Sequence, residues 1–190
     1  MTKLDGVLLT PGAGSGRDHH TLLALESALA PLPVARVDFP YRRAGRRGPD
    51  RQPVLLQCVR DEAAAFAHDR NLNPRNITLG GRSMGGRMCS IAVAEGTPAA
   101  GLVLISYPLH PPGKPEKLRT EHFPAITVPC VFVSGDRDAF GAPDELESAT
   151  RAIAGRVTHV WIEGGRHELD RVDDRIVDAV RAWISATFTG

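Results

Sequence analysis

The stretch 79-LGGRSMGGRM-88 places a single serine, Ser83, between glycines on both sides. It follows an apolar run with β-branched residues and precedes a segment with the pattern of a helix, so the serine lies at a strand-to-helix turn. Glycine costs stability because it has the most backbone freedom to lose on folding. Gly81, Gly85 and Gly86 therefore indicate either a backbone conformation that a β-carbon would forbid or a very close approach.

The residues from Gly81 to Gly85 form the pattern G-x-S-x-G. At a sharp strand–turn–helix, this pattern holds the serine in a strained conformation with its hydroxyl exposed, and the glycines let neighbouring backbone pass close by. The pattern alone is a weak signal, since many glycine-rich turns contain a serine, but here it has the strand before it and the helix after it. We interpret Ser83 as a candidate nucleophile; the alternative is an ordinary glycine-rich turn.

The composition is that of an ordinary globular protein, and we expect a single domain over residues 1–190. Hydrophobic residues make up 42% of the sequence. The 23 basic and 22 acidic residues leave a net charge of +1, which gives no indication of a nucleic-acid or membrane partner. The three cysteines are widely spaced, which predicts reduced thiols, and no residues have metal-ligand spacing, so we expect no metal or other cofactor. The sequence has no signal-peptide pattern, and we expect a cytoplasmic location. We expect a monomer or a homodimer.

Short apolar runs alternate with helical patterns along the whole chain. Several runs are apolar on both faces, as expected of parallel strands that helices cover on each side. This alternation predicts an α/β fold, with a doubly wound, mostly parallel sheet of about six strands and helices on both faces. The predicted strands are 4–10, 34–39, 76–81, 101–107, 130–135 and 157–163.

A serine nucleophile needs a base, and the base needs an acid that orients it. In a sheet of this kind these groups come in the chain order serine, acid, histidine, from the ends of later strands. Asp138 follows the strand at 130–135, and His167 follows the strand at 157–163 and two glycines. We therefore expect a catalytic triad of Ser83, Asp138 and His167.

Two carboxylates and several histidines compete for these roles. We prefer Asp138, the last residue of a G-x-x-D turn, because Asp136 would cap the turn by accepting hydrogen bonds from backbone amides; Asp136 stays the alternative. We expect His159, inside a strand, to be structural. The histidines expected at the surface are His19, His20, His68 and His122.

A tetrahedral oxyanion needs N–H donors. One is expected from the backbone of Met84, directly after the nucleophile at a helix N-terminus. The other is expected from the loop 10-TPGAGSG-16, at Ala13. This loop also suits a phosphate cradle. However, its glycines lack the G-x-G-x-x-G spacing and no Walker lysine follows, so the nucleotide interpretation is weak.

Two basic loops, 40–53 and 107–119, follow strand ends, at the edge where open α/β sheets bind ligands. The predicted substrate-binding residues are Arg42, Arg82, Arg87 and His110. For any single arginine an ordinary solvated surface position is the competing interpretation. Together they would make the mouth of the site positive and favour an acyl substrate that bears a carboxylate or a phosphate.

These residues together resemble the α/β-hydrolase superfamily over nearly the whole chain. The resemblance implies a minimal member without a cap domain. More narrowly, 81-GRSMGGR-87, 106-SYPLHPPGKPEKLR-119 and 131-VFVSGDRD-138 are similar to the small branch related to testis-expressed protein 30 and to the hydrolase-like domain of the third subunit of the NSL chromatin complex. Some members of this branch are named after dienelactone hydrolases, which use a cysteine where this chain has Ser83.

The resemblance implies a serine hydrolase that cleaves an ester or thioester bond of a small acyl substrate. Many hydrolases carry His-Gly in the oxyanion loop, where this chain has Pro11-Gly12. The rival hypothesis is a non-catalytic binding module within a protein complex, as the relatives in multi-subunit assemblies suggest. The complete serine, aspartate and histidine set favours the enzyme.

Overall fold

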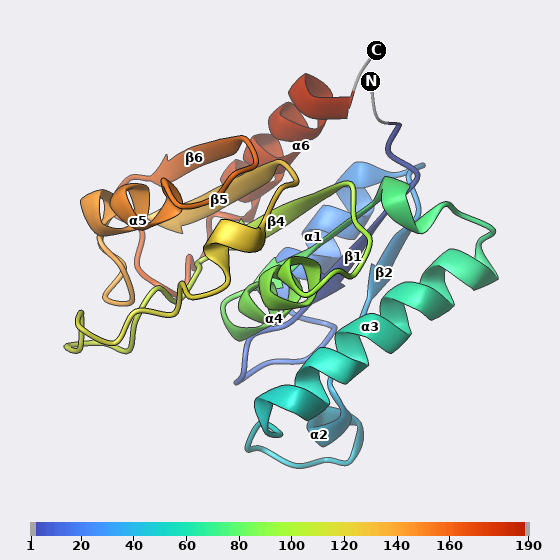
Figure 1. Cartoon of the computed structure of the whole chain (residues 1–190), viewed down its shortest axis with the longest axis horizontal. Helices are drawn as coiled ribbons and strands as arrows, with labels where there is room; N and C mark the ends of the chain where they lie inside the picture. Colours follow the sequence, from blue (N-terminus) through green and yellow to red (C-terminus); the bar gives the residue numbers. More distant parts are fainter. Residues whose placement is uncertain (1–2, 189–190) are drawn as a thin grey trace.

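The computed structural model describes residues 3–188 and contains one six-stranded sheet in the order β2-β1-β3-β4-β5-β6. Every pair of neighbouring strands is parallel, so the predicted α/β sheet is confirmed and is parallel throughout the described residues. Figure 1 shows the twisted sheet with helices on both sides. The strands are β1 (Gly6–Thr10), β2 (Val34–Arg36), β3 (Ile77–Arg82), β4 (Gly101–Ile105), β5 (Cys130–Gly135) and β6 (Val157–Ile162).

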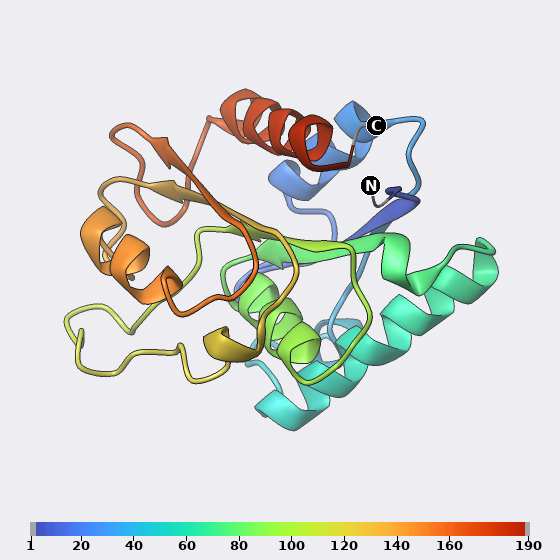
Figure 2. The same cartoon turned by 45° about the horizontal axis from the view of Figure 1, so that its top comes forward.

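Helices cover both faces of the sheet and leave one core on each side. One core lies under α1 and α6, and the other lies under α3, α4 and α5, as Figure 2 shows from a second direction. The helices are α1 (His20–Leu29), α2 (Pro40–Arg43), α3 (Gln52–Asp69), α4 (Met84–Ala94), α5 (Pro143–Thr150) and α6 (Asp173–Phe188), with short 3₁₀ turns at Pro74–Asn76 and Phe123–Ala125.

The central strands are apolar on both faces because both faces are covered. In β4, Leu102 and Leu104 pack into the core beneath α3 and α4, while Val103 and Ile105 pack into the core beneath α1 and α6. Successive side chains of a strand point to opposite faces, so a continuous apolar run is what this position requires. The three cysteines are free and buried, as expected.

The chain changes direction across the sheet at β1. This strand pairs with β2 on one side and with β3 on the other, so the loops that leave β1 and β3 diverge at the carboxyl edge. Such a switch point is where open α/β sheets bind ligands. Within residues 3–188 no additional domain covers this edge, and no helix there is long and apolar enough to cross a bilayer.

The segment 34–43 differs from its prediction. The predicted strand 34–39 is paired as a strand only over Val34–Arg36, and the start of the arginine loop forms the one-turn helix α2. Pro40 explains the change: it occupies the first turn of α2, where a missing N–H costs nothing, and Phe39 has turned out of the sheet as the N-cap.

Candidate active site

Ser83 occupies a strained turn between β3 and α4. Its backbone has φ 50° and ψ −119°, and its N–H donates to the carbonyl oxygen of Ile105 at 2.8 Å. A β-carbon at Gly81 would lie 2.1 Å from the carbonyl oxygen of Thr10, and one at Gly85 would lie 2.5 Å from that of Pro11. The glycines are therefore required because the turn passes directly against the end of β1.

The three predicted residues meet at this turn. Ser83 Oγ lies 2.8 Å from His167 Nε2, and His167 Nδ1 lies 2.8 Å from Asp138 Oδ2. The other carboxylate oxygen, Oδ1, accepts the backbone N–H of Phe140 at 2.8 Å. With its side chain only 2% exposed, Asp138 is held from both oxygens in one orientation.

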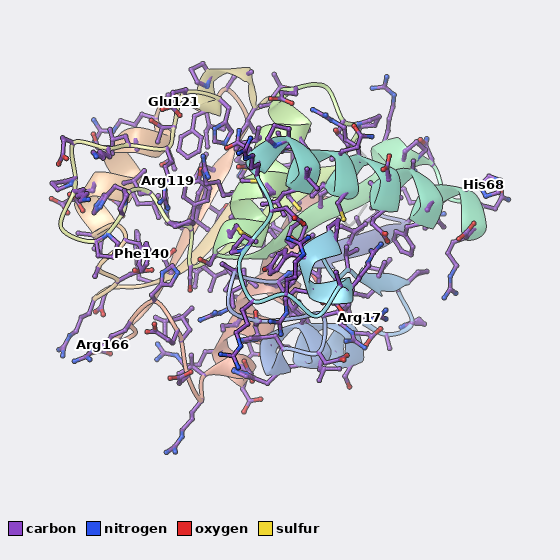
Figure 3. All side chains as sticks on the ribbon, turned by 90° about the horizontal axis from the view of Figure 1, so that it is seen from below. Arg17, His68, Arg119, Glu121, Phe140 and Arg166 are labelled. Carbon is purple, nitrogen blue, oxygen red and sulfur yellow. The ribbon has the colours of Figure 1, made fainter. Side chains whose placement is uncertain are left out.

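The surroundings of His167 fix its ring. Because Asp138 accepts from Nδ1–H, the lone pair of Nε2 faces the Ser83 hydroxyl. The Phe140 ring, labelled in Figure 3, stacks on the imidazole of His167, with ring centroids 3.9 Å apart. The guanidinium of Arg82 donates to the carbonyl oxygen of His167 at 3.0 Å and also to that of Glu168. Ring, carboxylate and loop backbone are thus all restrained.

Asp136 does not make the expected turn cap. Its Oδ1 is buried without a hydrogen-bond partner in the described part of the chain. The backbone closes the turn instead, because the Asp138 N–H donates to the carbonyl oxygen of Gly135, and the Arg137 N–H ties the turn to the loop after β6 by donating to the carbonyl oxygen of Gly165. Within residues 3–188, His167 makes its hydrogen bond to a carboxylate with Asp138 and not with Asp136.

Met84 and Ala13, the two expected oxyanion donors, line the same cleft as Ser83. Met84 begins α4, where the helix offers its N–H no acceptor. Ala13 follows Gly12, whose carbonyl oxygen accepts the N–H of Ser15; because a trans peptide holds its C=O and N–H on opposite sides, the Ala13 N–H points away from that turn. Neither N–H donates a hydrogen bond within residues 3–188. Buried Tyr41 steadies the loop by donating its hydroxyl to the Ala13 carbonyl oxygen at 2.8 Å.

An open cleft of about 670 Å³ lies over the serine. It is lined by Gly12, Ala13, Gly14, Ser15, His19, Arg82, Ser83, Met84, Arg87, Pro108, Arg119, Phe140 and His167. Of the four predicted substrate-binding residues, only Arg82 and Arg87 line it.

The other two predicted residues, His110 and Arg42, do not line this cleft. The His110 side chain is 5% exposed and lies between the carbonyl oxygen of Pro111 and the carboxylate of Glu145, so it does not reach the cleft. Arg42 lines a separate neighbouring hollow together with Asp38. Sequence patterns place a residue near an edge of the sheet, but they do not show which way its side chain turns.

Two histidines that were expected at the surface are partly buried. His19 lines the cleft, accepts the Thr21 N–H and has its pKa lowered to about 4 by burial. His122 lies 2.8 Å from Ser90 Oγ, and burial with the nearby charge of Arg87 lowers its pKa to about 4. His159 is structural, as expected: its ring stacks between those of Phe132 and Trp161.

Metal ligands do not gather anywhere in residues 3–188: no cluster of three or more histidine, cysteine, aspartate or glutamate side chains is placed to hold an ion. The residues that line the cleft carry instead two hydroxyls (Ser15 and Ser83), two imidazoles (His19 and His167) and three guanidinium groups (Arg82, Arg87 and Arg119). This set can activate a nucleophile and hold negative charge.

Comparison with known proteins decides the family. A model described as an alpha/beta hydrolase domain matches residues 4–185, almost the entire chain. The chain belongs to the α/β-hydrolase family. Within residues 3–188 the chain consists of the six-stranded sheet, its covering helices and the loops that join them.

Solved α/β-hydrolase structures share the fold at low sequence identity. Est1E from Butyrivibrio proteoclasticus has a TM-score of 0.76 and 15% identity, with 100% of this chain and 90% of that chain covered. A dienelactone hydrolase from Anabaena variabilis has a TM-score of 0.72 and 18% identity, with 97% of this chain and 88% of that chain covered. A serine hydrolase without lid from Xanthomonas campestris has a TM-score of 0.71 and 17% identity, with 96% of this chain and 84% of that chain covered. These likenesses establish the architecture.

Proposed function

We propose that the protein is a serine hydrolase that cleaves an ester or thioester bond of a small acyl substrate through an acyl-enzyme. The observation that carries the proposal is the unbroken chain of contacts from Ser83 Oγ to His167 Nε2 and from His167 Nδ1 to Asp138, at 2.8 Å each, beneath an open cleft. A binding module has no physical need for a strained serine in contact with an oriented base.

In the first half-reaction, Ser83 Oγ bonds to the substrate carbonyl carbon while its proton moves to His167 Nε2. The carbonyl oxygen becomes an oxyanion, for which the N–H groups of Met84 and Ala13 are the available donors. The buried Asp138 carboxylate stabilises the imidazolium that forms and keeps Nδ1 protonated.

The oxyanion then collapses to a carbonyl, and His167 passes its proton to the leaving alkoxide or thiolate. In the second half-reaction a water molecule gives a proton to Nε2 and attacks the acyl-enzyme. That proton returns to Ser83 as the acid is released, so the enzyme ends as it began. Phe140 stacks on one face of the imidazole and helps to keep the ring in place.

The test compares two aspartates of the same turn. Asp138→Asn should lower turnover of a short-chain 4-nitrophenyl ester by about 10⁴-fold, the loss seen when other serine hydrolases lose their triad aspartate. Asp136→Asn, which changes the same charge two residues away, should lose far less. Equal losses, or a Ser83→Ala variant as active as the wild type, would overturn the proposal.

The second candidate is the binding module suggested by the resemblance to subunits of larger complexes. It would require a folded protein that does not turn over any ester or thioester and a Ser83 that does not react. A screen across ester, thioester and peptide substrates separates the two candidates and also names the bond that is cleaved.

A further inference from the structure

Two arginines of the cleft have no acidic partner. Arg87 lies in the first turn of α4, four residues after Ser83, and Arg119 closes the loop 107–119. Both line the cleft over the serine. Within residues 3–188 no carboxylate lies within 4 Å of either guanidinium, whereas Arg36, like several arginines outside the cleft, is paired with acids.

Arg87 is incompletely hydrogen-bonded. Its Nε–H is buried and has no partner in the described chain, and one terminal nitrogen donates to Gln52 Oε1 at 3.2 Å. A buried donor without an acceptor costs about 1–3 kcal/mol. The buried Nε–H of Arg87 therefore lowers the stability of the empty protein, and a ligand oxygen that accepted this N–H would offset that loss.

Arg119 is held in place by its backbone, which leaves its guanidinium free for a ligand. Its N–H donates to the carbonyl oxygen of Leu109 at 2.8 Å, and its own carbonyl oxygen accepts the buried Tyr107 hydroxyl at 2.8 Å. Among the residues that the structure describes, the guanidinium makes only one long hydrogen bond, of 3.4 Å, to the carbonyl oxygen of Pro108. Figure 3 labels Arg119 on the same side of the molecule as Phe140.

The two guanidinium groups act on each other. Burial and then the positive charge of Arg87 lower the pKa of Arg119, and no carboxylate opposes either effect. Bringing like charges together away from water is unfavourable unless an anion offsets both. The remaining cleft arginine, Arg82, differs because its guanidinium is already bound to two carbonyl oxygens and feels four acids, of which Glu168 is the strongest.

We propose that Arg87 and Arg119 form a carboxylate-binding subsite, so that the substrate is a short ester or thioester that carries a carboxylate. The substrate class rests on the proposed hydrolase function; the binding site itself does not. Guanidinium groups are planar forks that match the two oxygens of a carboxylate, and charge-assisted hydrogen bonds of this kind are about twice as strong as neutral ones. The subsite lies within the cleft that holds the reacting serine.

The test uses binding in place of turnover. Succinamate, which carries one carboxylate, and its neutral analogue succinamide are titrated into ¹⁵N-labelled Ser83→Ala protein, and their dissociation constants are measured by NMR at low and high salt. Succinamate should bind at least about tenfold more tightly at low salt, and Arg87→Gln or Arg119→Gln should each weaken it by about tenfold or more, the size expected for a hydrogen bond to a charged group. High salt should reduce the difference.

Arg42→Gln is the matched control, since it removes one positive charge from the neighbouring hollow at the same edge of the sheet. This variant should weaken the binding of succinamate by no more than about twofold, because salt screens charges that lie apart from each other. Equal binding of succinamate and succinamide, or an equal loss in the Arg42 variant, would overturn the subsite. Because Ser83 is already absent, this result is independent of whether the wild type hydrolyses esters.

Discussion

Gly85 shows at the scale of a single residue why the serine turn accepts so few side chains. It lies in the first turn of α4, where alanine would normally be the better helix former. A β-carbon there would lie 2.5 Å from the carbonyl oxygen of Pro11 and 2.5 Å from Thr10 Oγ1. We expect Gly85→Ala to lower the free energy of unfolding by about 1–3 kcal/mol, as overpacking does, in urea denaturation.

Gly48→Ala is the control, because a β-carbon there meets nothing within 4 Å in an exposed loop. It should change the free energy of unfolding by less than about 0.5 kcal/mol. If both variants were equally stable, the close approach of the turn to the end of β1 would not be what requires glycine.

His122 predicts a particular pH dependence of stability. Burial lowers the pKa of its folded-state imidazole from 6.5 to about 4. Between these values the unfolded chain binds a proton that the folded protein does not, so this stabilisation is complete above pH 6.5 and is lost as the pH falls toward 4. His122→Gln removes the titration. The melting temperature of the wild type should therefore fall more than that of the variant between pH 7.5 and 5, measured by differential scanning fluorimetry.

His68→Gln is the matched control, since the His68 side chain is 89% exposed and lies far out at the end of α3, as Figure 3 shows. This variant should follow the wild type across the whole range. A constant difference between wild type and His122→Gln at every pH would contradict the assignment.

The order of Ser83, Asp138 and His167 along the chain was sufficient to predict that they lie together. Each follows a strand, and parallel strands have their carboxyl ends at one edge of the sheet. Side-chain direction was not predictable in this way. His110 is in a loop at the correct edge, yet it is buried against Glu145. No sequence signal marked Arg119 as different from the other basic residues of its loop, since its place depends on the hydroxyl of a buried tyrosine.

At the scale of elements, Arg82 joins the end of β3 to the loop that carries His167. Its guanidinium donates to two carbonyl oxygens of that loop, so we assign it a positioning role in place of the predicted substrate contact. Arg82→Met should lower kcat by about tenfold with little change in KM, since the lost hydrogen bonds orient the base and do not bind substrate. Arg82→Lys should recover part of the loss. Steady-state kinetics and melting temperatures are measured together.

Arg166→Met is the control, because Arg166 is exposed in the same loop and makes none of these contacts. It should keep the kcat of the wild type. An Arg82→Met variant with a lower melting temperature but an unchanged kcat would show that Arg82 has a purely structural role.

The pattern of apolar runs located every strand, because buried parallel strands must be apolar on both faces. It overestimated β2 at the edge of the sheet. There the half-buried strand is shorter, and Pro40 decides where the chain leaves the sheet. The error is local to β2, because the strand at the other edge of the sheet, β6, was predicted over 157–163 and is found at Val157–Ile162.

At the scale of the whole molecule, the site is open because no additional domain covers the carboxyl edge in residues 3–188. The cleft of about 670 Å³ leads straight to Ser83 and is lined by guanidinium groups as well as by apolar atoms. A long alkyl chain would gain little burial there. Turnover of 4-nitrophenyl esters should therefore fall steeply as the acyl chain lengthens beyond a few carbons, and a preference for long chains would contradict this picture.

The most direct test of the account is the reaction of Ser83 with a fluorophosphonate probe. Oriented by His167 and Asp138, the hydroxyl should displace fluoride and leave a stable phosphonyl adduct, which tandem mass spectrometry locates after digestion. The account predicts a single adduct on Ser83 in the wild type, a much slower reaction in Asp138→Asn, and no adduct in Ser83→Ala. A folded wild type that stays unlabelled, or an adduct on another residue, would contradict it.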